Sequence, residues 1–434
     1  MKRKLFDDWN AYIETAASSD PSEDVVSFQS RVLGREVRVE PSLAHQPEGL
    51  SSVVHAAGIK HEGVLDFAVV KMARRAAAAA VFTKNRCPAH AITFDRQTLA
   101  DGRAQLLAVV SKNANVFTPR GDEDVRTLAR WLSTEFDVDA NDIVLSFTGV
   151  IGVPLPMHKL ERAVAGLSKS LRPHALDAVA RAILTTDRGP KVCSVTIGDV
   201  VVCAMAKGAG MIEPNMATML AYFFTNAAVD AARLKAVLAD AVERSFNAIS
   251  VYSDTSTSDT VAIFSTGGAS IDGDGNAEAD FVDAVRCMSI KLARDIVAQS
   301  EGATKVIECT VRLDASPGDA AIVAKKIVNS PLFKAAVHGG DPNWGRIVMA
   351  IGKPDSRTNT PAVAPTDLVI RMMGEVVFSR SQPVGADLGQ LARKLREATR
   401  VSVDVRIGEG RHAATVWGCD LSARYVEINA EYMT

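Results

Sequence analysis

The alternation of hydrophobic and polar positions predicts short strands and amphipathic helices, mixed along most of the chain. Apolar runs separated by turn-forming or polar residues are typical of successive strands of one sheet. Val125, Leu128, Leu132 and Phe136 recur instead at helical spacing. In the first half we predict strands at 66–72, 76–82, 91–94 and 105–111, and helices at 123–136, 157–171 and 175–184.

The second half continues the same mixture. It begins with a hairpin, because Gly198-Asp199 lies between two β-branched runs. The first 45 residues are polar and indicate an extension with one short helix at 7–17. The whole pattern predicts a layered α/β or α+β fold in which helices sandwich the sheets. The later predicted strands are 218–226 and 260–266, and the later predicted helices are 229–249 and 280–299.

Composition narrows the possible partners. A chain of 434 residues that is 47% hydrophobic can bury more than one core, and its length favours two or three domains. Lys plus Arg (49) nearly balances Asp plus Glu (51), so the chain lacks the net positive field that holds nucleic acids or anionic membranes. No apolar run reaches the roughly 20 residues of a membrane span. We therefore expect no nucleic-acid or membrane partner.

The six cysteines are scattered, without Cys-x-x-Cys spacing or a nearby histidine pair. This pattern predicts buried, reduced thiols and no metal site. The basic N-terminus is not followed by the apolar stretch of a signal peptide. A reducing cytoplasm is the expected compartment.

One loop carries candidate chemistry. Residues 207–224, KGAGMIEPNMATMLAYFF, place glycines, Pro214 and then Ala217-Thr218 before a buried-strand pattern. A threonine hydroxyl needs a base beside it to act as a nucleophile, and the freed α-amino group of an N-terminal threonine can be that base. The threonine becomes N-terminal if its hydroxyl attacks the preceding carbonyl and water hydrolyses the ester. Glycine freedom, proline stiffness and a small preceding residue permit such self-cleavage.

The loop also has simpler interpretations. On these residues alone, a plain turn before a strand is the alternative. A phosphate-binding loop is disfavoured, because the order G-x-x-x-x-G-K-[ST] is absent and a strand rather than a helix is predicted to follow.

Blocks spread along the chain resemble one enzyme family. The segment KGAGMIEPNMATML resembles the processing site of the ornithine acetyltransferase (glutamate N-acetyltransferase) family, whose members cleave themselves at Ala-Thr. Further blocks follow in family order and cover nearly everything from about residue 50 to 434. These blocks are AAVFTKNRCPA (79–89), FTGVIGVPLPM (147–157), TTD (185–187), SFNAISVYSDTSTSDTV (245–261), EGATK (301–305), HGGDPNWGRI (338–347) and INAEYMT (428–434).

The resemblance implies the fold and the catalytic residues. The fold would be that of ornithine acetyltransferases and N-terminal-nucleophile aminopeptidases, with a smaller second α/β domain at about 280–400. Thr218 would be the nucleophile of self-cleavage and of catalysis. The cut after Ala217 would separate an α chain, 46–217 behind the extension 1–45, from a β chain, 218–434. Thr148 through its side chain and Gly149 through its N–H would form the oxyanion hole, each donor contributing roughly 3 kcal/mol.

Substrate-binding positions follow from the same resemblance. A lysine and a glutamate with neutral polar neighbours suit an amino acid that presents a carboxylate and an amine. Without the resemblance, Lys207 would be interpreted as a surface lysine and Glu301 as a solvated charge after a helix. The implied substrate-binding residues are Thr185, Lys207, Thr218, Glu301, Asn429 and Thr434.

The implied reaction is a pair of acyl transfers through one hydroxyl. The threonine takes the acetyl group of N-acetylornithine, and glutamate then removes it as N-acetylglutamate, a ping-pong sequence without metal or organic cofactor. Water must be kept out, because hydrolysis would waste the acetyl group. The family resemblance also implies a heterotetramer of two α and two β chains.

Some segments depart from the family pattern and leave the substrates open. They do not touch Thr218 or the oxyanion pair. A relative that uses another N-acyl amino acid, a hydrolase of the N-terminal-nucleophile aminopeptidase or amidase type, and an unprocessed scaffold stay as alternatives. The departures are the long extension, SKNANVF (111–117), Phe147, DRGPK (187–191) and VYSD (251–254).

Overall fold

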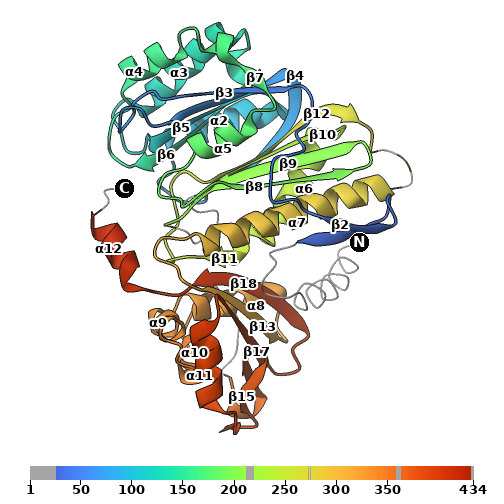
Figure 1. Ribbon diagram of the computed structural model, residues 1–434, viewed down its shortest axis with the longest axis vertical. Helices are drawn as coiled ribbons and strands as arrows, with labels where there is room; N and C mark the ends of the chain where they lie inside the picture. The colour runs from blue at the N-terminus through green and yellow to red at the C-terminus, as the bar shows by residue number, and fades with distance from the viewer. Residues whose placement is uncertain (1–25, 212–218, 272, 274, 358–362, 432–434) are drawn as a thin grey trace. The chain divides into compact units, whose positions relative to one another are not determined.

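The structure, a computed structural model, describes residues 26–211, 219–271, 273, 275–357 and 363–431. These residues belong to two compact units (Figure 1). Of the described residues, those within 26–247 and 253–299 form the larger unit, and those within 248–252 and 300–431 form the smaller. Each unit has its own sheet and its own hydrophobic core.

The larger unit is built on one mixed sheet. Among the described residues, nine strands join it, in the order β6-β5-β4-β12-β10-β9-β8 with β3 beside β4 and β7 beside β3. The bounds are β3 (Leu50–His55), β4 (Phe67–Phe82), β5 (Arg103–Asn113), β6 (Ile143–Val150), β7 (Arg172–Pro173), β8 (Lys191–Ile197), β9 (Val200–Lys207), β10 (Leu220–Ala227) and β12 (Thr260–Ala269).

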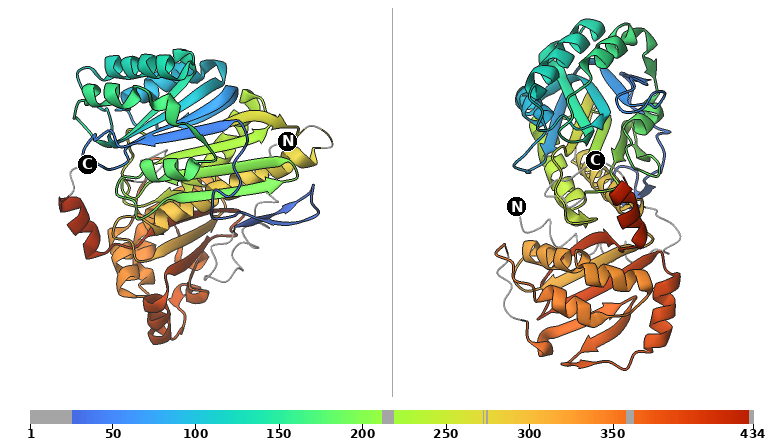
Figure 2. Two further views of the ribbon diagram at one scale, coloured as in Figure 1. Left: turned by 45° about the horizontal axis from the view of Figure 1, so that its top comes forward. Right: turned by 90° about the vertical axis from the view of Figure 1, so that its left-hand side faces the viewer.

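Helices cover both faces of this sheet. Helix α5 packs on one face, through residues such as Val179 and Ala180. Helices α2, α3 and α4 pack on the other face near β5 and β6, and α6 and α7 lie over β4, β8 and β9, as Figure 2 shows for α7. The expected sandwich is confirmed. The bounds are α2 (His90–Thr98), α3 (Gly121–Phe136), α4 (Met157–Val164), α5 (Leu176–Ala182), α6 (Ala231–Glu243) and α7 (Asn276–Ala298).

The alanine-rich part of β4 makes room for large neighbours. Ala78 of β4 lies opposite Phe264 of β12, and Phe264 lies opposite Phe224 of β10. The two phenylalanine rings stack with centroids 5.4 Å apart and are fully buried. Small residues facing large ones allow dense packing without voids.

A hairpin near the N-terminus also belongs to the larger unit. Strand β1 (Ser27–Ser30) pairs with β2 (Arg35–Arg38), and Asp280 of α7 accepts hydrogen bonds from the Ser30 hydroxyl (2.5 Å) and the Arg31 N–H (2.8 Å). The buried carboxylate therefore holds this segment against α7. The helix predicted at 7–17 lies outside the described residues.

The smaller unit has a second sheet, covered by helices on one face. Its strands run in the order β11-β18-β13-β17-β14-β15-β16, and helices α8 to α11 supply the other half of the core. The bounds are β11 (Ile249–Ser250), β13 (Val306–Leu313), β14 (Leu368–Met372), β15 (Glu375–Ser379), β16 (Gln382–Pro383), β17 (Arg400–Ile407), β18 (His412–Cys419), α8 (Pro317–Val328), α9 (Pro331–Gly339), α10 (Trp344–Ile351), α11 (Leu388–Glu397) and α12 (Ala423–Glu431).

The helices of the smaller unit begin at side-chain caps that the sequence encodes. Ser316 accepts a hydrogen bond from the Asp319 N–H, and Ser330 accepts one from the Phe333 N–H. A proline follows each serine at the first helical position, where its missing N–H costs nothing. The two Ser-Pro pairs therefore determine where α8 and α9 start.

Most predicted elements are confirmed, and one is wrong. The hairpin at Gly198-Asp199 joins β8 and β9, and the patterns after it correspond to β10, α6, β12 and α7. Residues 91–94, predicted as a strand, belong to helix α2, whose buried positions Ala91, Asp95 and Thr98 follow helical spacing. A short apolar run does not by itself distinguish the two structures. The strands predicted at 66–72 and 76–82 form the single strand β4.

Within the described ranges, no helix combines the length and the apolar character that crossing a membrane would require.

The stacked phenylalanine pair generates a stability prediction. Phe264→Ala removes a fully buried ring, which should lower the free energy of unfolding by about 3–5 kcal/mol. Phe117→Ala removes a ring that is 72% exposed and should change it by less than about 0.5 kcal/mol. Urea unfolding followed by tryptophan fluorescence measures both, and equal losses would contradict this account of the core.

Candidate active site

The loop that carries the candidate cleavage site connects two paired strands. Strand β9 ends at Lys207, β10 begins at Leu220, and these two residues lie opposite each other in the antiparallel ladder. The chain thus leaves the sheet at Lys207 and returns beside it. Ala217 and Thr218, together with Thr434, lie outside the described residues.

Lys207 is buried and touches the expected oxyanion residue. Its side chain is among the fully buried ones, and its ammonium donates a hydrogen bond to the Thr148 hydroxyl at 3.0 Å. Strands β6 and β9, which carry these residues, are not neighbours in the sheet. A buried ammonium must be paired or hydrogen-bonded, because burial removes its hydration. The interpretation of Lys207 as a surface lysine is therefore wrong.

Asp187 hydrogen-bonds several groups of the chain near Lys207. Its Oδ1 accepts hydrogen bonds from the Lys191 ammonium (2.7 Å) and the Gly208 N–H (2.6 Å), and its Oδ2 accepts one from the Thr185 N–H (3.1 Å). Burial opposes its ionisation, but Lys207, Lys191 and the Gly208 N–H outweigh burial and lower the pKa of Asp187 to about 2. Asp187 thereby ties an expected substrate residue to the start of the cleavage loop.

Gly149 occupies a position that only glycine fits. Its φ is +142°, and an added Cβ would lie 2.1 Å from the carbonyl carbon of Lys112 on β5. The β5–β6 ladder is irregular at this point, and Lys112 itself has a φ of +77°. The Lys112 ammonium donates to the carbonyl oxygens of Leu184 (2.8 Å) and Thr185 (3.1 Å). The two strand ends and the Thr185 segment are thus held together.

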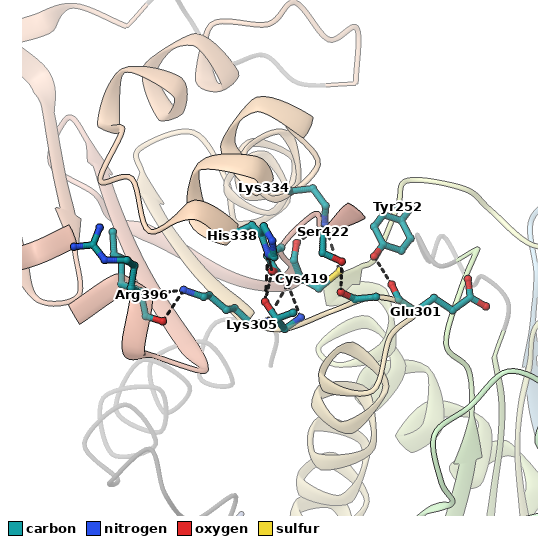
Figure 3. Close-up of polar contacts among 12 residues, drawn as sticks. Tyr252, Glu301, Lys305, Lys334, His338, Arg396, Cys419 and Ser422 are labelled. Atoms are coloured by element: carbon teal, nitrogen blue, oxygen red, sulfur yellow. Dashed lines mark hydrogen bonds and ion pairs between the residues drawn. The ribbon is translucent and has the colours of Figure 1, made fainter. Parts of the chain in front are cut away.

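In the smaller unit, Glu301 and Asn429 touch each other. The Asn429 amide donates to Glu301 Oε2 at 3.0 Å. The Tyr252 hydroxyl donates to the backbone oxygen of Glu301 at 2.5 Å (Figure 3). Glu301 is only 6% exposed, so its interpretation as a solvated charge is wrong. Next to it, Gly302 has a φ of +71°, and a Cβ there would lie 2.5 Å from the Tyr425 nitrogen at the start of α12.

The segment after Glu301 is held by a buried carboxylate. Asp420 accepts hydrogen bonds from the N–H groups of Thr304 (2.8 Å) and Lys305 (2.9 Å), and His338 Nδ1 lies 2.7 Å from it. In Figure 3, His338 and Lys305 lie on one side of the labelled residues, and Glu301 lies on the opposite side. Burial favours the neutral acid, but the bonds from Thr304, His338 and Lys305 outweigh it and lower the pKa of Asp420.

Pattern reasoning missed several residues of this arrangement. It left Asp187 without a role, although the TTD block contains it, and it treated DRGPK and VYSD only as departures. Lys191 of DRGPK forms the buried ion pair with Asp187, and Tyr252 of VYSD anchors the backbone of Glu301. These two departures thus lie in direct contact with a candidate substrate residue or its support.

A metal centre and a surface hollow are two other kinds of site that the described ranges could contain. Nowhere in them do three or more His, Cys, Asp or Glu side chains gather in a way that could hold a metal ion. A surface hollow of ≈ 730 Å³ is lined by polar side chains, including Arg75, Asp101 and Asp142. Arg75 already donates to both oxygens of Asp142 (2.6 and 2.7 Å), and the predicted site residues are not among those that line the hollow.

Comparison with known proteins decides the family. The sequence pattern of the ArgJ family matches residues 51–434. The chain belongs to the ArgJ family. Its resemblance to the ornithine acetyltransferase and glutamate N-acetyltransferase family is thereby confirmed.

Three ArgJ-family relatives illustrate the similarity. Arginine biosynthesis bifunctional protein ArgJ 2 of Clostridium acetobutylicum is 40% identical over 380 residues, covering 86% of this chain and 95% of that protein. Glutamate N-acetyltransferase Oat2 of Streptomyces clavuligerus is 37% identical over 392 residues, covering 88% and 97%. The crystal structure of ArgJ from Bacillus halodurans aligns with a TM-score of 0.44 and 35% identity, over 48% of this chain and 96% of that chain.

The Asp187 cluster predicts a pH-dependent contribution to stability. The pKa of Asp187 is lower in the folded chain than its ordinary value of 3.8, so the stability it contributes is present above about pH 4 and is lost as the pH falls towards 2. Asp187→Asn should therefore lower the free energy of unfolding most above pH 4, by on the order of 2 kcal/mol, and least near pH 2.

Urea titrations at a series of pH values measure this difference. Asp122→Asn is the matched control, because the Asp122 side chain is 70% exposed. A constant difference between wild type and Asp187→Asn from pH 2 to pH 7 would contradict the assignment.

Proposed function

We propose that this chain is a self-cleaving acetyltransferase of arginine biosynthesis, which moves an acetyl group from N-acetylornithine to glutamate. The observation that carries the proposal is the buried contact between Lys207 and Thr148. Lys207 directly precedes the candidate cleavage loop, and Thr148 is an expected oxyanion-hole residue. Membership of the ArgJ family and the names of relatives that span 86–88% of this chain support it.

In the proposed self-cleavage, the Thr218 hydroxyl attacks the Ala217 carbonyl carbon. The C–N bond breaks as the C–Oγ bond forms, and water then hydrolyses the ester. The products are an α chain that ends at Ala217 and a β chain that begins at Thr218 with a free α-amino group. We place the α chain at 46–217, behind the extension, and the β chain at 218–434.

In the proposed transfer, the α-amino group accepts the proton of the Thr218 hydroxyl, and the oxygen attacks the acetyl carbonyl. The Thr148 hydroxyl and the Gly149 N–H would stabilise the oxyanion, and the Lys207 ammonium beside Thr148 adds positive potential where that charge develops. Ornithine leaves with the proton, and the amine of glutamate then attacks the acetyl ester. The threonine is thereby regenerated.

Recognition of the amino-acid part would use groups of opposite charge. Glu301, held by Asn429 and Tyr252, offers a carboxylate to a substrate ammonium. Lys207 offers a cation for a substrate carboxylate, with Thr185 and Thr434 as neutral partners. Because Tyr252 and Lys191 depart from the family pattern, another N-acyl amino acid is the alternative donor. We further propose a cytoplasmic α2β2 assembly, with a native mass near twice the 46.2 kDa of one chain.

Thr218→Ala tests self-cleavage. We expect wild type to give two fragments of similar size on a denaturing gel, and Thr218→Ala to give one band at 46.2 kDa without acetyl transfer, because the attacking hydroxyl is gone. Thr196→Ala, an exposed threonine on β8, is the control and should cleave normally. A single full-length band from folded, active wild type would sink the proposal.

The same preparation separates a transferase from a hydrolase. Acetate released from N-acetylornithine at one rate with and without glutamate would identify a hydrolase. A screen of N-acetyl amino acids against ornithine and glutamate as acceptors identifies the donor and acceptor.

Two neighbouring glycines test the oxyanion hole. Both Gly149 and Gly152 have positive φ, but a Cβ at Gly149 meets the Lys112 backbone at 2.1 Å, whereas one at Gly152 meets nothing within 4 Å. Gly149→Ala should lower kcat for acetyl transfer by about 100-fold or more, because it displaces an oxyanion donor. Gly152→Ala, which adds backbone strain but no steric clash, should keep kcat within a few-fold of wild type. Equal kinetics for the two variants would argue against the assigned hole.

A further inference from the structure

A buried ammonium in the smaller unit, which the mechanism above does not use, supports the segment that carries Tyr252. Lys334 on α9 is buried, and its Nζ donates to the carbonyl oxygens of Val251 (2.8 Å) and Cys419 (2.5 Å). The same Nζ lies 5.1 Å from the centre of the Tyr252 ring. An ammonium over the face of an aromatic ring is attracted by the ring's quadrupole. Lys334 therefore holds Tyr252 through its ring and through the residue before it.

Tyr252 in turn holds the backbone of Glu301. Its hydroxyl donates to the Glu301 carbonyl oxygen at 2.5 Å. Burial, with Cys419 and Asp420 nearby, raises the pKa of Tyr252. The hydroxyl therefore keeps its proton throughout the neutral pH range and acts as a permanent donor to Glu301.

The ring of Tyr252 also positions helix α12. The rings of Tyr252 and Tyr425 lie with their centroids 3.7 Å apart, and Tyr425 belongs to α12. One turn further along this helix, the Asn429 amide donates to Glu301 Oε2 at 3.0 Å. Tyr252 thus acts on Glu301 in two ways, directly through the carbonyl oxygen and indirectly through the helix that carries Asn429.

The Glu301 carboxylate is suited to a cation from outside the chain. Glu301 is buried, and among the described residues its side chain accepts one hydrogen bond, from the neutral amide of Asn429. A buried carboxylate is costly unless a cation pairs with it. Figure 3 shows this side chain pointing away from the other labelled residues. In N-acetylornithine the α nitrogen is acylated, so the ammonium available to Glu301 is the one on the side chain.

We propose that Tyr252 is a positioning residue that makes the enzyme selective for donors with a side-chain ammonium, because it holds Glu301 and Asn429 in the arrangement that receives this ammonium. This inference rests on the proposed function. Tyr252 does not have to touch the substrate. Without its hydroxyl, the backbone of Glu301 is released, and the carboxylate is no longer held where a charge-assisted hydrogen bond to the ammonium is strongest. A donor without the ammonium makes no such bond, so its binding does not depend on Tyr252.

The experiment compares two donors that differ by one amine. N-acetylnorvaline has the carbon chain of N-acetylornithine without the side-chain amine, and we expect wild type to favour N-acetylornithine in kcat/KM. Tyr252→Phe removes the hydroxyl and keeps the ring against Tyr425. It should raise KM for N-acetylornithine by about tenfold or more and leave kcat within about twofold, because an interaction common to the ground and transition states is weakened. Both constants for N-acetylnorvaline should stay within about twofold of wild type.

Two further variants accompany Tyr252→Phe. Thr310→Val is the matched control: the buried Thr310 hydroxyl lies 2.8 Å from the Thr415 hydroxyl on β18, and this bond does not involve Glu301 or α12. It should leave both donors as in wild type. Tyr425→Leu removes the other ring of the stacked pair and leaves Tyr252 intact, so it should raise KM for N-acetylornithine selectively even if Tyr252→Phe does not fold.

The outcomes separate this inference from the proposed function. The role of Tyr252 is overturned, with the function intact, if wild type transfers acetyl groups but does not favour N-acetylornithine over N-acetylnorvaline. It is also overturned if the variants of Tyr252 and Tyr425 leave KM for N-acetylornithine unchanged, or weaken both donors equally. Failure of wild type to transfer acetyl from any N-acetyl amino acid to glutamate would overturn the proposed function instead.

Discussion

The ammonium of Lys207 is buried at the end of β9, and the structure around it is arranged to keep that charge satisfied. It donates to the Thr148 hydroxyl, and the carboxylate of Asp187 lies close enough for the two charges to stabilise each other. Asp187 in turn binds Lys191, Gly208 and Thr185. Because a buried charge is costly unless its partners are in place, this requirement orders the strand ends on which the candidate oxyanion hole depends.

Two buried carboxyls near this lysine respond to their surroundings in opposite ways. Asp187 faces two ammonium groups and has a lowered pKa, whereas Asp259 accepts one backbone N–H and has a raised pKa. Two residues of one chemical type thereby have pKa values shifted in opposite directions. The divergence of the two pKa values arises from burial and neighbouring charge rather than from residue identity.

Much of the architecture follows from local patterns. The hairpin at Gly198-Asp199 and the Ser-Pro caps of α8 and α9 are determined by turn and cap chemistry that acts within a few residues. Residues 91–94 fail the same reasoning, because four apolar-rich positions fit either a strand or one face of a helix. What decides between them is the packing of α2 against β6, a contact between segments about fifty residues apart.

The candidate site, like the fold, depends partly on local sequence and partly on tertiary contacts. The sequence alone determined the family and supplied the candidate cleavage loop and candidate site residues, because these are carried by residue types in a particular order. Only the tertiary structure decided that Lys207 and Glu301 are buried, that Lys191 pairs with Asp187, and that Asp259 holds Met219. Burial and pairing depend on which strands lie together, and a residue's neighbours in space are not its neighbours along the chain.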